Sequence, residues 1–325
     1  MSPFLVALLA ALGLTGVLLP VLRRADVMDV PNARSSHAAP IPRGGGIGVY
    51  AALLVACGVA AAVGGEVGRV PLLVGLGLAV VGLVDDLRGL SGPTRLVLQV
   101  LAGIGVAAWA AESVEATAGR WVTLTAIVVL VVGFVNAFNF MDGVNGISAL
   151  SGTVAGLWFG YVGGRVDEPG LSTLGLALAG ALLGFLPWNA PRARVFLGDV
   201  GSYGVGLVIA SMCAWAWVSG AALPLAVAPL VVYGADTAWV LVKRARGRRP
   251  LMEAHREHVY QRLVDGLGWS HLGAATAAAL ASALVCLAAW LGRDVPVLSV
   301  TVAVAVAAAY LSLPRLATRQ KAVHA

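Results

Sequence analysis

The stretch W-V-T-L-T-A-I-V-V-L-V-V-G-F-V-N-A-F-N-F-M-D-G-V-N-G, Trp121 to Gly146, decides the fold. Residues 121–138 are almost wholly apolar, and roughly 20 such residues cross the hydrocarbon core of a bilayer. Polar groups follow at the end of the segment, where Gly143 and Gly146 allow the chain to break and turn. The pattern predicts a membrane helix that delivers amide and carboxylate groups to one surface.

The same pattern recurs along the chain. Eleven apolar segments of spanning length are predicted, at about 3–22, 44–64, 70–86, 94–111, 121–138, 146–164, 170–187, 201–218, 221–242, 271–292 and 295–313. We therefore expect an all-α, polytopic integral membrane protein with about 11 transmembrane helices. Residues 1–325 form a single domain in this interpretation, and the first segment is a retained helix because it lacks the basic start and cleavage site of a signal peptide.

Composition supports a lipid environment. The 325 residues are 59% hydrophobic and 12% charged, with a mean hydropathy of +0.88, whereas soluble domains are about 25% charged. The three cysteines, Cys57, Cys213 and Cys286, lie singly in apolar segments and indicate neither zinc nor disulfides. Most glycines, such as Gly75, Gly77 and Gly82, are expected to let helices pack closely. The net charge of +6 is a topology signal and gives no indication of nucleic-acid binding.

Lysine and arginine predict the orientation. Eighteen of the 22 fall on one set of loops, and the other four are Arg69, Arg120, Arg165 and Arg293. Basic loops remain in the cytoplasm, so we expect the N-terminus outside and the C-terminus in the cytoplasm. The loops at about 23–43, 87–93, 139–145, 188–200 and 243–270 would then form one cytoplasmic face.

Acidic and amide residues gather on that same face. Asp85 and Asp86 end the third segment, and Asn136, Asn139 and Asp142 are spaced by three on one helical stripe. Oxygen donors of this kind suit Mg²⁺ or a nucleotide. A solvated helix end paired with Arg88, and polar contacts between helices, are the structural alternatives.

Asp199 precedes an apolar segment in N-A-P-R-A-R-V-F-L-G-D-V-G-S, Asn189 to Ser202. It could cap that helix, or it could be a metal carboxylate beside a helix N-terminus, where phosphate oxygens also bind.

Two basic loops are candidates for binding phosphates. The first, Asp29 to Gly46, offers Arg34, His37 and Arg43, and its glycine triplet predicts a turn whose N–H groups face phosphate. An ordinary basic loop is the alternative.

The second basic loop reads H-R-E-H-V-Y-Q-R-L, His255 to Leu263. Helical spacing would place His255, His258 and Arg262 on one face, and with Arg256 they favour a diphosphate clamp. An amphipathic helix on anionic lipid is the alternative. Asp236 lies within the ninth segment, where a carboxylate is a functional candidate, with no partner evident from the sequence.

Taken together, these residues resemble the polyprenyl-phosphate N-acetylhexosamine-1-phosphate transferases, of which the phospho-N-acetylmuramoyl-pentapeptide translocase is a distant member. The likeness covers nearly the whole chain. It rests on D-x-P-N-x-R-x-x-H, P-x-P-R-G-G, the D-D pair, N-x-x-N-x-x-D-G-x-x-G, F-x-G-D-x-G-S and the D-T at 236–237. H-R-E-H-V-Y-Q-R departs from the triple histidine of the translocase and resembles the branch that uses UDP-N-acetylhexosamines for surface polysaccharides.

The resemblance implies a multi-pass enzyme of the bacterial cytoplasmic membrane, and a possible homodimer. It would transfer N-acetylhexosamine-1-phosphate from a UDP-sugar to polyprenyl phosphate, releasing UMP, as the first step of cell-envelope polysaccharide synthesis. By similarity Asp199 and Asn139 would hold Mg²⁺, or Mn²⁺ in its place. Asp85 or Asp86 would lie by the carrier phosphate, as base or as orienter.

By the same similarity, Asp142 and Asn145 would help to bind nucleotide and metal. The remaining substrate contacts would come from His255, Arg256, His258, Arg262, Arg43 and Asn189. A secondary transporter would also explain eleven segments and Asp236. Transporters, however, place their polar groups near the midplane of paired halves, and this chain shows no internal repeat. A scaffold subunit would leave the ordered polar motifs unexplained.

Overall fold

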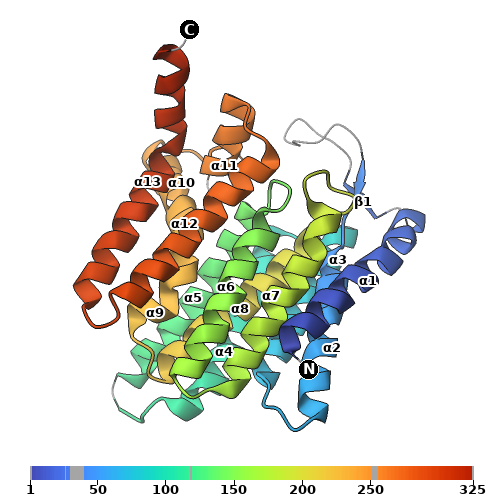
Figure 1. The fold of residues 1–325 in the computed structure, drawn as a ribbon, viewed down its shortest axis with the longest axis vertical. Helices are drawn as coiled ribbons and strands as arrows, with labels where there is room; N and C mark the ends of the chain where they lie inside the picture. The colour runs from blue at the N-terminus through green and yellow to red at the C-terminus, as the bar shows by residue number, and fades with distance from the viewer. Residues whose placement is uncertain (1, 26, 30–39, 118, 251–254, 324–325) are drawn as a thin grey trace.

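The computed structural model describes residues 2–25, 27–29, 40–117, 119–250 and 255–323, with side chains up to residue 318. It is a bundle of long helices (Figure 1). They are α1 Pro3–Arg24, α2 Gly46–Ala62, α3 Arg69–Arg88, α4 Gly92–Ala110, α5 Arg120–Met141, α6 Ile147–Arg165, α7 Pro169–Asn189, α8 Gly198–Val218, α10 Val231–Arg246, α12 His271–Leu291 and α13 Pro296–Val323. The shorter elements are β1 Met28–Asp29, β2 Ile41–Pro42, η1 Ala111–Ser113, α9 Leu223–Val227, η2 Ala228–Leu230, α11 Val259–Gln261 and η3 Arg262–Gly266.

The predicted all-α, polytopic membrane architecture is confirmed. Every one of the eleven apolar segments is helical, and within the described residues nine helical segments are long and apolar enough to cross a membrane. The two others are α2, which has 17 residues, and α6, which is long enough but less apolar. The ninth segment is not one helix, because the chain passes through α9 and η2 before α10 begins.

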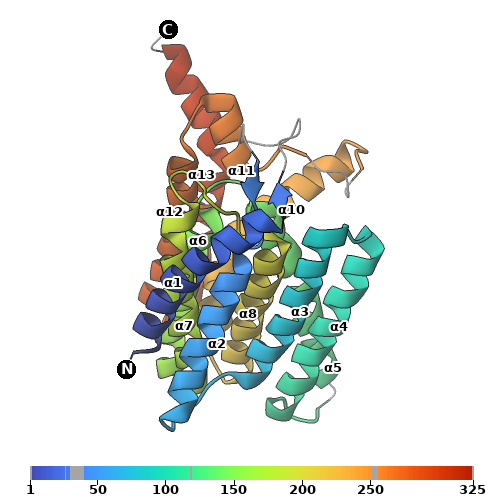
Figure 2. The same ribbon diagram turned by 90° about the vertical axis from the view of Figure 1, so that its right-hand side faces the viewer.

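Helix α8 occupies the centre of the bundle, with α3 and α5 packed along it (Figure 2). Close approach depends on glycine. A side chain at Gly82 of α3 would collide with the backbone at Asp199 and Val200, and one at Gly46 of α2 would collide with Gly201. The packing role expected of Gly75 and Gly82 is therefore confirmed, whereas Gly77 faces open space.

The polar segments gather at one end of the bundle. The two-stranded hairpin β1–β2, α11, the end of α10 and the end of α13 all lie there (Figures 1 and 2). The hairpin pairs Met28 with Pro42 and Asp29 with Ile41 in antiparallel register. The connections from α5 to α6 and from α7 to α8 reach the same end, so loops that are distant in the sequence meet.

Candidate active site

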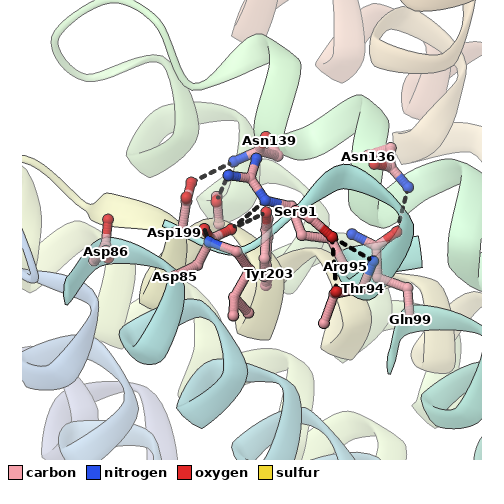
Figure 3. A network of polar contacts seen from close by, with 12 residues as sticks. Asp85, Asp86, Ser91, Thr94, Arg95, Gln99, Asn136, Asn139, Asp199 and Tyr203 are labelled. Atoms are coloured by element: carbon pink, nitrogen blue, oxygen red, sulfur yellow. Dashed lines mark hydrogen bonds and ion pairs between the residues drawn. The ribbon is translucent and has the colours of Figure 1, made fainter. Parts of the chain in front are cut away.

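Asp85 stands in the last turn of α3 and is almost completely buried. Its carboxylate accepts hydrogen bonds from the Leu90 amide and the Tyr203 hydroxyl, each at 2.8 Å, and forms an ion pair with Arg95 Nε at 2.8 Å (Figure 3). A buried carboxylate is costly unless its oxygens are paired in this way. Arg95 of α4 is therefore the cation for this carboxylate, in place of the Arg88 that the structural alternative would have paired with the acidic pair.

Asp86 points to the first turn of α8. Its Oδ2 accepts from the Val200 amide at 3.1 Å, and its Oδ1 lies 3.7 Å from Arg43. The positive end of a helix dipole stabilises a carboxylate at this position. Asp86 thus caps α8 from a neighbouring helix. Asp199 lies within the first turn and does not serve as the cap.

Asn139 and Asp199 are in direct contact. The Asn139 amide nitrogen donates to Asp199 Oδ1 at 2.8 Å and to Ser202 Oγ at 2.9 Å. Asn136, one turn earlier, donates instead to Gln99 of α4 at 2.6 Å (Figure 3). The predicted stripe therefore divides, with Asn136 joining two helices and Asn139 facing the acidic cluster.

Asp142 follows α5 directly and accepts a hydrogen bond from Ser148 Oγ at 2.6 Å. Its removal from water raises the pKa of this carboxyl to about 6, an effect that Ser148 reduces and the nearby Asp86 charge increases. A carboxyl with that pKa changes charge just below neutral pH.

Negative charge is in excess around these residues. The carboxylates of Asp85 and Asp86 both repel Asp199, and the arginines that pair with the cluster in the described residues are Arg43 and Arg95. Four carboxylates, Asp142 included, thus face two guanidinium groups.

The donor set fits a metal ion that is shared with substrate. No group of three or more histidine, cysteine, aspartate or glutamate side chains in the described ranges could hold a metal alone. Mg²⁺ does not require such a group, since it usually binds one or two carboxylates together with water and substrate phosphates. Asp199 and Asn139 would hold it here, and it would neutralise phosphate charge.

Residues 255–258 do not form the helix that their spacing predicted. The helix begins at Val259, so His255 does not share a helical face with His258 and Arg262. Two carboxylates cause the difference. Glu257 pairs with Lys243 at 2.7 Å and with Arg244 at 2.9 Å. The second carboxylate is that of Asp236, which accepts a hydrogen bond from the Val259 amide at 3.1 Å.

The histidines of this loop differ in environment. His258 is buried, whereas His255 is half-buried. Burial, with His258 and Arg244 nearby, lowers the pKa of His255 to about 4, so its ring is neutral at pH 7. Arg256 and Arg262 line a cavity of about 410 Å³, where Arg256 forms an ion pair with Asp265 at 3.4 Å.

Three other predicted residues contact the backbone or the cluster. Asn189 is buried; its Oδ1 accepts from the Gly146 amide at 2.6 Å and its Nδ2 donates to the Val195 carbonyl at 3.1 Å. Asn145 donates to the Pro191 carbonyl at 3.1 Å. Arg43 bridges Asp29 and Asp86.

Two of the three amides in the glycine triplet, Gly44 to Gly46, are not free to face a phosphate as predicted. The amides of Gly45 and Gly46 donate to the carbonyls of Phe196 and Leu197, each at 2.8 Å. These groups join α2 to the segment before α8 and are not available to an anion. Arg34 and His37 lie outside the described residues.

Several residues of the site gave no clear sequence signal. Arg95 counted only as a basic loop residue, and Tyr203 lies inside an apolar segment. Ser202 ends a quoted motif, but no role was assigned to it. Glu257 lies between His255 and His258, and its position suggested no role. Their roles depend on which helices are neighbours, which a single sequence does not show.

A polytopic membrane protein with buried carboxylates at one end of its helices matches a known class of membrane transferases. The model of glycosyl transferase family 4 matches residues 69–216, which include the acidic cluster. The chain is 32% identical to the decaprenyl-phosphate N-acetylglucosaminephosphotransferase of Mycolicibacterium smegmatis, over 76% of this chain and 71% of that protein.

Two further relatives widen the comparison. One is a probable undecaprenyl-phosphate N-acetylglucosaminyl 1-phosphate transferase of Bacillus subtilis, 27% identical over 82% of this chain and 78% of that protein. The other is a phospho-N-acetylmuramoyl-pentapeptide-transferase of a Synechococcus species, 31% identical over 79% and 82%. The chain belongs to glycosyl transferase family 4, and the resemblance in its motifs is confirmed.

Proposed function

We propose that this protein transfers N-acetylhexosamine-1-phosphate from a UDP-N-acetylhexosamine to polyprenyl phosphate, as the initiating step of cell-envelope polysaccharide synthesis. The contact of Asn139 with Asp199, at 2.8 Å within a buried acidic cluster at the membrane surface, carries the proposal. The names of the relatives support the same chemistry for polyprenyl phosphate and an N-acetylglucosamine phosphate.

The proposed reaction exchanges one phosphorus–oxygen bond for another. An oxygen of the polyprenyl phosphate bonds to the β-phosphorus of the UDP-sugar, the bond from that phosphorus to the bridging oxygen breaks, and UMP leaves. Both reactants are anions and the cluster is acidic, so they repel each other and the protein. A divalent cation at Asp199 and Asn139 would offset this repulsion and the charge on departing UMP.

Positioning is the main task that remains for the carboxylates. A phosphate monoester is already ionised near neutral pH, so a strong general base is less necessary than alignment. The oxygens of Asp85 have three protein partners, and we assign it to fixing Arg95 and Tyr203. Asp86 holds the first turn of α8, and Arg43 beside it offers a cation to the carrier phosphate.

The polar end of the bundle would face the cytoplasm. The bias of lysine and arginine toward this end supports that orientation, with the N-terminus outside and the C-terminus inside. The UDP-sugar would then reach the site from the cytoplasm and the carrier from the inner leaflet. The arginines of the 243–270 loop would meet the diphosphate.

A panel of nucleotide sugars tests the proposal. The purified protein in detergent is mixed with polyprenyl phosphate and, in turn, UDP-N-acetylglucosamine, UDP-N-acetylgalactosamine and UDP-N-acetylmuramoyl-pentapeptide. UMP and the lipid product are followed by mass spectrometry, with Mg²⁺ and with a chelator. We expect Mg²⁺-dependent UMP from an N-acetylhexosamine donor. Folded protein that releases none from any donor would overturn the proposal.

A further inference from the structure

Asp236 is a fully buried carboxylate on α10, outside the acidic cluster and outside the part of the chain that the family model matches. Its Oδ1 lies 3.1 Å from His258 Nδ1, and its Oδ2 accepts from the Val259 amide at 3.1 Å. The partner that the sequence could not supply is therefore the loop after α10. We call these two contacts the Asp236 anchor.

The Asp236 anchor fixes where α11 begins. Val259 is the first residue of α11, and its amide would lack a partner within the helix. The carboxylate of Asp236 takes that amide, in the manner of a helix cap supplied by another element.

From the anchor, contacts lead directly to the end of α5. His258 stacks on Tyr260, with ring centroids 5.8 Å apart and an interplanar angle of 11°. The Tyr260 hydroxyl donates to the Phe140 carbonyl at 2.9 Å. It occupies the space beside Gly143, where a side chain would collide with it. The anchor is thus linked to the turn that carries Asp142.

Contacts in the other direction reach His255. The His258 amide donates to Gln261 Oε1 at 3.2 Å, and Gln261 Nε2 donates to the His255 carbonyl at 3.3 Å. The backbone before the anchor is therefore set by the same few residues, and Arg256 lies on that stretch of backbone.

The energetics favour a role in positioning over one in stability. Burying a carboxylate and an imidazole is costly until they are paired, and apolar replacements are often as stable. The best supported use of such a pair is to fix one arrangement among several. A loop with irregular backbone over a site benefits from that.

We propose that Asp236 and His258 are positioning residues, and that His258 acts through the loop without contacting substrate. The anchor holds His255 and Arg256 at the diphosphate of the nucleotide sugar and holds Tyr260 against the end of α5. This inference rests on the proposed function for the identity of the substrate.

Four variants test it: Asp236→Ala, His258→Ala, the double variant and Asp236→Asn. Thr237→Val is the matched control, since its buried hydroxyl has no hydrogen-bond partner in the described part of the chain. For each variant kcat and KM are measured separately for the UDP-sugar and for polyprenyl phosphate. Hydrogen–deuterium exchange of residues 255–262 is measured in the same detergent.

We expect Asp236→Ala and His258→Ala to lower kcat/KM for the UDP-sugar by similar factors, about 10- to 100-fold. The double variant should lose no more than either one, because both break one anchor. KM for polyprenyl phosphate should remain within about twofold, and exchange should accelerate in residues 255–262 only. A much larger loss in His258→Ala than in Asp236→Ala, or additive losses, would overturn the proposal.

Asp236→Asn separates hydrogen bonding from charge. The asparagine oxygen can accept from Val259 while its amide donates to the other tautomer of His258. We therefore expect activity within about fivefold of wild type. An inactive Asp236→Asn would mean that Asp236 carries a proton or a metal, contrary to the proposal. If wild type released no UMP, the proposed function would fail, while exchange would still report on the anchor.

Discussion

The two polar regions at this end of the molecule differ in charge and in backbone. The acidic cluster, Asp85, Asp86, Asn139, Asp142 and Asp199, sits at the ends of regular helices and has more carboxylates than arginines around it. The anchored loop, residues 255–262, is irregular before Val259 and helical from there on, and it has the opposite charge balance. Its one central carboxylate, Glu257, is surrounded by Lys243, Arg244 and Arg249.

Under the proposed function, the acidic cluster and the anchored loop would bind different parts of the substrates. An acidic site binds anions only through a cation, so the cluster suits the reacting phosphates together with Mg²⁺. A basic loop binds anions directly, so the anchored loop suits the nucleotide diphosphate. Substitutions should therefore produce two kinds of kinetic defect, turnover in the cluster and substrate affinity in the loop.

The largest effect is expected from Asp199→Asn. The change removes one charge from the proposed Mg²⁺ site while preserving its shape. We expect kcat to fall by about 10³-fold or more, because a charged ligand near the reacting phosphates is lost. UMP release at saturating substrate and Mg²⁺ measures it.

Ser211→Ala is the control on the same helix, since the Ser211 hydroxyl has no partner in the described residues. It should retain full activity, and both variants should unfold within a few degrees of wild type. Near-normal turnover in Asp199→Asn would show that Asp199 does not hold the metal. The proposed difference in function between the two regions would then be wrong.

Arg95→Ala should have the next largest effect. It leaves Asp85 buried without its cation, which destabilises the fold and shifts Tyr203. We expect kcat to fall by about 10- to 100-fold, as when residues that orient a metal site are removed. The double variant Arg95→Ala, Asp85→Asn should recover thermal stability in detergent, because no unpaired charge remains. Failure to recover would show that Arg95 acts elsewhere than on Asp85.

Much of the acidic cluster could be predicted from the sequence, because carboxylates at the ends of apolar segments must meet at a membrane surface. What could not be predicted depended on neighbours. Asn136 and Asn139 are three residues apart, which turns them about 60° from each other on a helix. That angle is enough to direct one to Gln99 of α4 and the other to Asp199 of α8.

The anchored loop shows the opposite case. The spacing of His255, His258 and Arg262 predicted one helical face, but local periodicity does not reveal a carboxylate from another helix. Asp236 sets the start of α11 at Val259 and thereby separates His255 from the helix. The prediction for the glycine triplet differs from the structure for the same reason, since the amides of Gly45 and Gly46 donate to carbonyls that are distant in the sequence.

The pH dependence of activity should sharpen the contrast further. The pKa of Asp142 is raised to about 6, so its charge is lost as pH falls through that value. If the ionised form binds nucleotide and metal, kcat/KM for the UDP-sugar should fall about tenfold per pH unit below 6. Ser148→Ala removes a hydrogen bond that lowers this pKa, so the acidic limb of the pH profile, where kcat/KM falls, should move to higher pH. An unchanged limb in Ser148→Ala would exclude Asp142 as its source.

The contribution of Asp142 to the free energy of unfolding should change with pH in the opposite direction to its contribution to activity. The folded pKa of Asp142 lies above its ordinary value of 3.8, so the folded state binds this proton more tightly. Its contribution to stability is therefore fully present below about pH 4 and is lost as pH rises through about 6. Thermal unfolding of wild type and Asp142→Asn across this range should diverge as pH increases, with the asparagine variant losing less.

The smallest effect is expected from Glu257→Gln, which loosens the loop without breaking the Asp236 anchor. The hydrogen bond from Lys243 chiefly lowers the pKa of Glu257, to about 2, so it stays ionised in any assay and its stabilising contribution is lost only as pH falls from about 4.5 toward 2. We expect KM for the UDP-sugar to rise about two- to fivefold with kcat unchanged, the scale of a partly exposed ion pair. The increase should be the same from pH 6 to 8 and smaller in high salt. Asp294→Asn, in the connection between α12 and α13, is the control. A fall in kcat with KM unchanged would show that the anchored loop shares the work of the acidic cluster.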